Sequence, residues 1–146
     1  MIEWEYTELW RKRGEGFCVE VTHKIEPLCV EGRARVEEGR NRWCVYVYIY
    51  PAHPHFNAFE GDRLWQEATN AMPLHGGASY LTRHCDTQGN ITSIQVGADY
   101  HHDGDQSYTY FDDKEEAGVV FYDAELLFAW LQVDKQKQLI AANQKQ

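Results

Sequence analysis

Histidine and aspartate gather in the second half of the chain at positions that could do chemistry. His75 precedes two glycines, and His101, His102 and Asp103 are consecutive. Imidazole and carboxylate groups bind catalytic transition metals, which keep one coordination position open for water or substrate. These four residues predict, as one alternative, a divalent transition-metal site of a small hydrolase or nuclease.

The predicted strands around these residues would bring them together. A hairpin formed by residues 78–85 and 91–100 would place His75 near the 101–103 group, while His53 and His55, which follow another predicted strand, are further candidate ligands. The sequence lacks HExxH, CxxC and GxSxG motifs. A second interpretation therefore stays open, in which the histidines cap strands and bond to loop backbone without binding metal.

The charge of the chain indicates a different kind of function. The formal net charge of −9 argues against general nucleic-acid binding and against adhesion to anionic membranes. From Asp99 to Glu125 there are nine acidic residues and one lysine. An acidic face steers a basic partner toward it. The predicted partner-binding residues are Asp99, Asp103, Asp105, Asp112, Asp113, Glu115 and Glu116.

The elements that must position these residues are mostly strands. Period-two patterns predict strands over residues 4–10, 17–23 and 43–50, followed by the 78–85 and 91–100 hairpin. Both faces of residues 43–50 are apolar or aromatic, which predicts a central strand covered on both sides. Residues 27–41 are polar and read as a surface loop.

Two helices complete the expected architecture. Asp62 is a candidate cap for a short helix over residues 62–70, and Asp112 or Asp113 for a helix over residues 112–133. Val120, Ala124, Leu127 and Leu131 form its core-facing stripe. We expect a single α+β domain over residues 1–134, with an antiparallel sheet of about five strands and helices on one face. Residues 135–146 are expected to form a polar tail or to extend the last helix.

Composition indicates the compartment. Four cysteines without close pairs, and an N-terminus without a basic and apolar secretory segment, predict reduced thiols and a cytoplasmic protein. No apolar stretch is long enough to span a bilayer. The sequence gives no reason to expect a cofactor beyond the alternative metal, and it does not fix the oligomeric state.

Several segments resemble a group of small uncharacterised proteins encoded by bacteriophages and prophages. The most specific are the HGG-x-S-Y segment at residues 75–80 and the G-A-D-Y-H-H-D segment at residues 97–103, with further similarity at residues 41–50 and 53–56. No activity is established for that group, so the resemblance implies no catalytic residues. It implies a phage or mobile-element origin and a host cytoplasm as the place of work.

Two functions from different classes follow. The leading hypothesis is a phage interaction protein that binds a basic, nucleic-acid-binding surface of a host protein and inhibits it, as an anti-CRISPR or other anti-defence protein does. The alternative is the metal-dependent hydrolase or nuclease. A structural or morphogenetic phage protein is a third possibility, although no repeat or coiled coil supports it.

Overall fold

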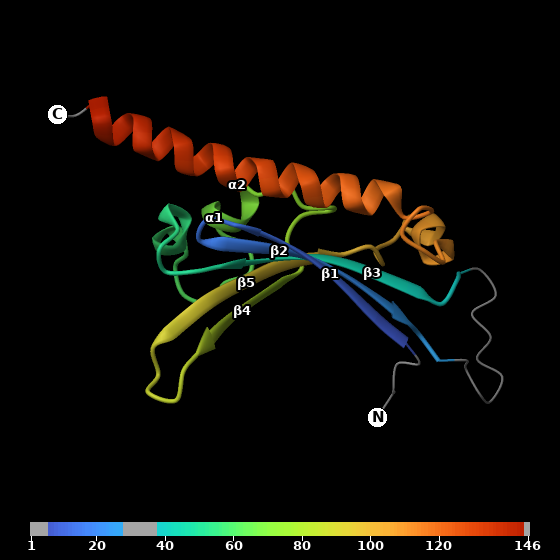
Figure 1. Ribbon diagram of the computed structural model, residues 1–146. Coiled ribbons are helices and arrows are strands. Elements are labelled where there is room, and N and C mark those ends of the chain that lie inside the picture. The colour runs from blue at the N-terminus through green and yellow to red at the C-terminus, as the bar shows by residue number, and fades with distance from the viewer. Residues whose placement is uncertain (1–5, 28–37, 145–146) are drawn as a thin grey trace.

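A computed structural model describes residues 6–27 and 38–144, which build a five-stranded antiparallel sheet with helices on one face (Figure 1). The strand order is β1-β2-β3-β5-β4, and this architecture confirms the predicted α+β fold. The elements are β1 (Tyr6–Gly14), β2 (Phe17–Ile25), β3 (Asn41–Ile49), the 3-10 helix η1 (Pro54–Ala58), α1 (Glu67–Asn70), β4 (Tyr80–Cys85), β5 (Ile91–Asp99), the 3-10 helix η2 (Gln106–Tyr110) and α2 (Gly118–Gln144).

The first hairpin is longer than the sequence pattern predicts. β1 continues to Gly14, paired in register with Phe17, and Arg11 within this extension forms an ion pair of 2.9 Å with Glu20 on β2. Gly16 takes a φ of +83° in the turn, which a side chain would strain. Residues 4 and 5 of the predicted strand, and most of the predicted 27–41 loop, lie outside the described residues.

β3 is the central strand, but helices cover only one of its faces. Val47 and Ile49 are fully buried on the face beneath α2. Tyr46 and Tyr48, on the other face, are half-buried. Within the described part of the chain all helices lie on one side of the sheet (Figure 1), so the prediction of cover on both sides was wrong. Aromatic rings tolerate partial exposure, and their presence alone does not require a second layer.

The short helix near residue 62 was predicted too long. α1 occupies only Glu67–Asn70, and the residue that caps its start is Gln66. The backbone N–H of Gln66 donates a hydrogen bond of 3.0 Å to Thr69 Oγ1. Asp62 instead forms an ion pair of 3.2 Å with Arg83 on β4. The residue expected to cap this helix, Asp62, therefore contacts a strand instead of the helix start.

The long helix α2 begins later than expected. Asp113 Oδ1 accepts a hydrogen bond from the Glu116 amide, and the Asp113 carbonyl accepts one from the Ala117 amide, in a turn that precedes the helix. The helix begins at Gly118 and continues to Gln144, through most of the segment expected to be a tail or an extension. It packs on β2, β3 and η1. The predicted stripe is confirmed, because all of its members are buried: Val120, Ala124, Leu127 and Leu131.

Candidate functional site

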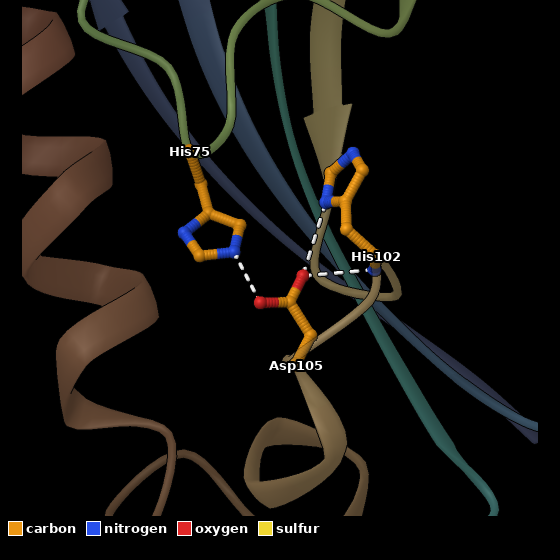
Figure 2. A group of neighbouring side chains, drawn as sticks. All are labelled: His75, His102 and Asp105. Atoms are coloured by element: carbon orange, nitrogen blue, oxygen red, sulfur yellow. Dashed lines mark hydrogen bonds and ion pairs between the residues drawn. The ribbon is translucent and has the colours of Figure 1, made fainter.

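Asp105 lies between two histidines beside the end of β5 (Figure 2). Its Oδ1 is 2.8 Å from Nε2 of His75, and its Oδ2 is 3.0 Å from Nδ1 of His102. The backbone N–H of His102 also donates to Oδ2, at 2.9 Å. One carboxylate therefore joins two imidazole rings that are 27 residues apart in the sequence.

Three segments converge to build this cluster, which we call the His75–His102–Asp105 cluster. His75 belongs to the loop between α1 and β4, His102 to the turn after β5, and Asp105 directly precedes η2. The glycine after His75 makes the approach possible, because Gly76 has a φ of +70° and a Cβ there would lie 3.3 Å from the His102 ring. The loops at the two ends of the β4–β5 hairpin therefore lie together, and Asp105 joins His75 of one loop to His102 of the other.

Aromatic packing fixes the ring of His75. It stacks on Tyr100 with ring centroids 4.3 Å apart and an interplanar angle of 13°. The Tyr108 ring meets it edge-on at 5.0 Å. Tyr100 is itself held by a hydrogen bond of 2.7 Å from its hydroxyl to Asp123 on α2, and burial together with this carboxylate raises the pKa of Tyr100. The cluster is therefore attached to the core on one side.

Electrostatics keep Asp105 ionised. Burial alone would raise its pKa, but the hydrogen bonds from the His102 amide and from the two rings outweigh burial and hold the pKa of Asp105 below its usual range. An ionised carboxylate only accepts hydrogen bonds. The facing nitrogens, Nε2 of His75 and Nδ1 of His102, therefore carry the ring protons.

The second nitrogen of His102 points to another carboxylate. Its Nε2 lies 3.5 Å from Oδ1 of Asp99, the last residue of β5. Asp99 is in turn fixed by its backbone N–H, which donates to Ser79 Oγ at 3.2 Å, and by the His101 amide, which donates to its Oδ1 at 3.1 Å. The His102 ring thus has a carboxylate at each nitrogen.

Two of the four predicted metal ligands do not take part in the cluster. The ring of His101 turns away and its Nε2 lies 2.9 Å from Glu38. Asp103 is exposed, and its place is taken by Asp105, two residues later. Asp105 does not cap η2 with its side chain but accepts from the preceding His102 amide, so a search for helix caps in the sequence would not have found it.

The additional candidates His53 and His55 lie elsewhere in the core. His53 Nδ1 accepts a hydrogen bond of 3.0 Å from the His55 amide at the start of η1, and its ring packs edge-on against Phe17. Nε2 of His55 lies 3.4 Å from the carbonyl of Ala68. Across the described residues, His75, His102 and Asp105 are the one group of three whose atoms could share a metal ion.

Most of the predicted partner-binding carboxylates are exposed. Asp99 is partly exposed and Asp105 is buried, whereas the remaining five point to solvent: Asp103, Asp112, Asp113, Glu115 and Glu116. We call these five the acidic segment. None of them forms an ion pair within the described chain, while basic side chains on the sheet and its loops are matched to carboxylates in the pairs Arg11–Glu20, Lys12–Glu125, Arg42–Glu26, Arg63–Glu60 and Arg83–Asp62.

Comparisons with family models, with curated proteins and with solved structures found no match to this chain. The residues that the structure describes include no helix with the length and apolar character needed to cross a membrane. The chemistry of the site therefore rests on two features of this chain, the His75–His102–Asp105 cluster and the acidic segment.

Proposed function

We propose that this chain is a phage-encoded interaction protein that binds a basic, nucleic-acid-binding surface of a host protein and inhibits it. The observation that supports this proposal is the acidic segment, whose five exposed carboxylates have no ion pair within the described chain. Such carboxylates are available to a cationic partner, because no lysine or arginine among residues 6–27 and 38–144 pairs with them.

The fold holds part of this charge on a rigid frame. Asn41, the first residue of β3, donates from its side chain to Asp112 at 2.9 Å and to the carbonyl of Thr109 at 3.0 Å. Asp113 is fixed by the amide of Glu116. Carboxylates held in this way lose little conformational freedom on binding, which favours recognition of a surface that otherwise binds phosphates.

The decisive experiment neutralises four of these charges together. The variant Asp112→Asn, Asp113→Asn, Glu115→Gln and Glu116→Gln preserves side-chain shape and the hydrogen-bonding oxygens of residues 112 and 113. We expect association with the basic partner to slow by about tenfold or more at low salt, because electrostatic steering contributes a factor of this order. The measurement is capture from host lysate followed by binding kinetics with the purified partner.

A charge-matched variant controls for net charge alone. Glu15→Gln, Glu60→Gln, Asp62→Asn and Glu67→Gln remove four exposed acids outside the acidic segment. This variant should retain partner binding, and short duplex DNA should compete with the wild-type protein for the partner. Equal binding by the two quadruple variants, or binding unaffected by either, would contradict the proposal.

A metal-dependent hydrolase or nuclease is the second candidate function, and the His75–His102–Asp105 cluster favours it. Hydrolysis there requires a bound metal with an open position for water. Turnover of a nucleic acid or phosphoester in the presence of zinc or manganese, lost in Asp105→Asn and kept in Asp103→Asn, would support this function. Absence of turnover in such a screen would leave the interaction proposal as the better account.

A further inference from the structure

We propose that His75, His102 and Asp105 bind one divalent transition-metal ion, with zinc as the first ion to test. One nitrogen or oxygen atom from each residue lies within 4.8 Å of the others. Two imidazoles and one carboxylate are a common donor set for zinc, and also suit iron and manganese. The inference concerns this cluster alone and does not depend on the acidic segment.

The geometry is close to that of a metal centre. Metal bonds of about 2.1 Å place neighbouring ligand atoms about 3.0–3.4 Å apart in tetrahedral or octahedral sites. The two nitrogen–oxygen separations are 2.8 Å from His75 Nε2 to Oδ1 of Asp105 and 3.0 Å from His102 Nδ1 to its Oδ2, so the carboxylate presents one oxygen to each ring. Ligand atoms up to 4.8 Å apart would have to draw closer around an ion, and each imidazole would bind it through a nitrogen that carries no proton.

The groups around the ligands have the roles expected of a metal centre's outer partners. Asp99 faces the outer nitrogen of His102 at 3.5 Å, which is the carboxylate–histidine–metal arrangement that orients a ring and raises its basicity. Tyr100 stacks on His75 and sets its plane. These contacts hold both rings, and Asp105 is only 7% exposed.

The cluster has solvent on one side. The His102 side chain retains 36% of its exposure, whereas the His75 side chain retains 21%. An ion held by three protein ligands would keep at least one further position for water or an exogenous ligand. The inferred centre is therefore one that a small molecule or a partner side chain can reach.

Metal binding can be measured directly on the full chain. Untagged protein is stripped with a chelator, dialysed, and titrated with Zn²⁺, Mn²⁺ or Fe²⁺ under anaerobic conditions, with bound metal counted by elemental mass spectrometry. We expect about one tightly bound equivalent of at least one of these ions. His75→Ala, His102→Ala and Asp105→Asn should each weaken this binding at least tenfold.

Neighbouring histidines provide matched controls. His101→Ala removes the adjacent ring, which pairs with Glu38, and His84→Ala removes a ring on β4 that bonds to Gln95. Both variants should bind metal as the wild type does. Asp99→Asn should keep the stoichiometry and weaken affinity by about 10–100-fold, since it alters only the orienting carboxylate.

A loss of fold must be separated from a loss of ligands. His102 is the most exposed of the three, so its variant is the one expected to stay folded, and circular dichroism checks each protein. Cobalt(II) absorption bands report ligation in place. Binding of none of the three ions would overturn the proposal, as would equal binding by folded His102→Ala and the wild type.

Discussion

At the scale of single residues, the Asp105 side chain connects three segments of the chain through hydrogen bonds. Its two carboxylate oxygens accept hydrogen bonds from the rings of His75 and His102 and from the His102 amide. Buried carboxylates with several hydrogen-bond donors are costly to alter, because the donors are left without an acceptor. Asp103, two residues away, is exposed and has no ion pair within the described chain. A substitution at Asp103 is therefore a suitable control for one at Asp105.

Replacing Asp105 by asparagine should destabilise the metal-free protein by about 1.5–3 kcal/mol at neutral pH, the range for hydrogen bonds to charged groups. The pKa of Asp105 is lowered in the native state. A lowered carboxyl pKa stabilises the fold above the unfolded value of about 3.9. That contribution is lost as the pH falls through the native pKa, so the difference between wild type and Asp105→Asn should narrow below about pH 4.

Urea unfolding of the two proteins at several pH values in chelator tests this prediction. Asp103→Asn is the control and should change the free energy of unfolding by no more than about 0.5 kcal/mol, as exposed sites do. An Asp105→Asn protein as stable as the wild type at neutral pH would show that the two histidines gain nothing from the carboxylate.

The thiols should differ in reactivity according to their burial. Burial raises the pKa of Cys44 and of Cys18, whereas Cys85 is exposed at the end of β4. Thiolates are the reactive form, so Cys85 should be alkylated first in the folded protein. Cys29 lies outside the described residues, and a Cys29→Ser background removes it from the count. Mass spectrometry after timed iodoacetamide treatment measures the order, and early modification of Cys44 would contradict it.

At the scale of elements, α2 is the helix that closes the core. Its buried stripe packs on β2 and β3, while its other faces carry exposed apolar residues such as Val119 and Leu126. Tyr100, which directly follows β5, also donates a hydrogen bond to Asp123 on this helix. The helix therefore supports the candidate site as well as the core.

Two adjacent leucines on α2 allow a matched comparison. Leu127 is 0% exposed and Leu126 is 45% exposed. Leu127→Ala should lower the free energy of unfolding by about 2–5 kcal/mol, because it removes buried methyl groups and leaves a cavity. Leu126→Ala should change it by about 0.5 kcal/mol or less. Thermal or denaturant unfolding measures both, and similar losses for the two would contradict the packing described here.

The elements that the sequence predicts well are those with a strong apolar period. The Val120 to Leu131 stripe and the alternation along β3 are read directly from side-chain type, because burial imposes period 3.6 or period 2. The start of α2 and the extent of α1 were predicted wrongly. Asp62 pairs with the distant Arg83, and Asp113 accepts from the Glu116 amide in a separate turn before α2. Sequence spacing alone does not distinguish these contacts from helix caps.

The candidate site was predicted in part. The hairpin between His75 and His102 indicates that these two rings meet, since the ends of a hairpin lie together. The carboxylate was assigned to Asp103 because it is adjacent to His102. The tight turn after β5, in which the Asp105 amide bonds to the His102 carbonyl at 2.9 Å, brings the later aspartate back instead.

At the scale of the whole molecule, charge is unevenly neutralised. Arg11, Arg42 and Arg83 on the sheet each pair with a carboxylate, whereas the acidic segment has no ion pair among the described residues. Salt at about 0.1–0.15 M screens interactions between surface charges over about 8–10 Å. The long-range field of the protein is therefore negative at the segment between β5 and α2.

Partner association should accordingly depend on ionic strength. Raising salt from low to physiological concentration should slow association of the wild type severalfold, with a smaller effect on dissociation, since steering acts on encounter. The quadruple variant of the acidic segment should show a flatter dependence. Stopped-flow or surface kinetics over a salt series provides the measurement, and parallel slopes for the two proteins would argue against an acidic docking face.

The sheet order has a consequence for how the chain folds. β1, β2 and β3 pair with sequence neighbours, as do β4 and β5, but β3 joins β5 by pairing Ile49 with Ile94 across a long intervening chain. Closing that loop costs entropy before any contact forms, so refolding is expected in milliseconds to seconds. His75 precedes the β4–β5 hairpin, and His102 and Asp105 follow it. The cluster therefore assembles only once the β4–β5 hairpin has closed, and the amides of its loops should exchange with solvent before those of the paired strands.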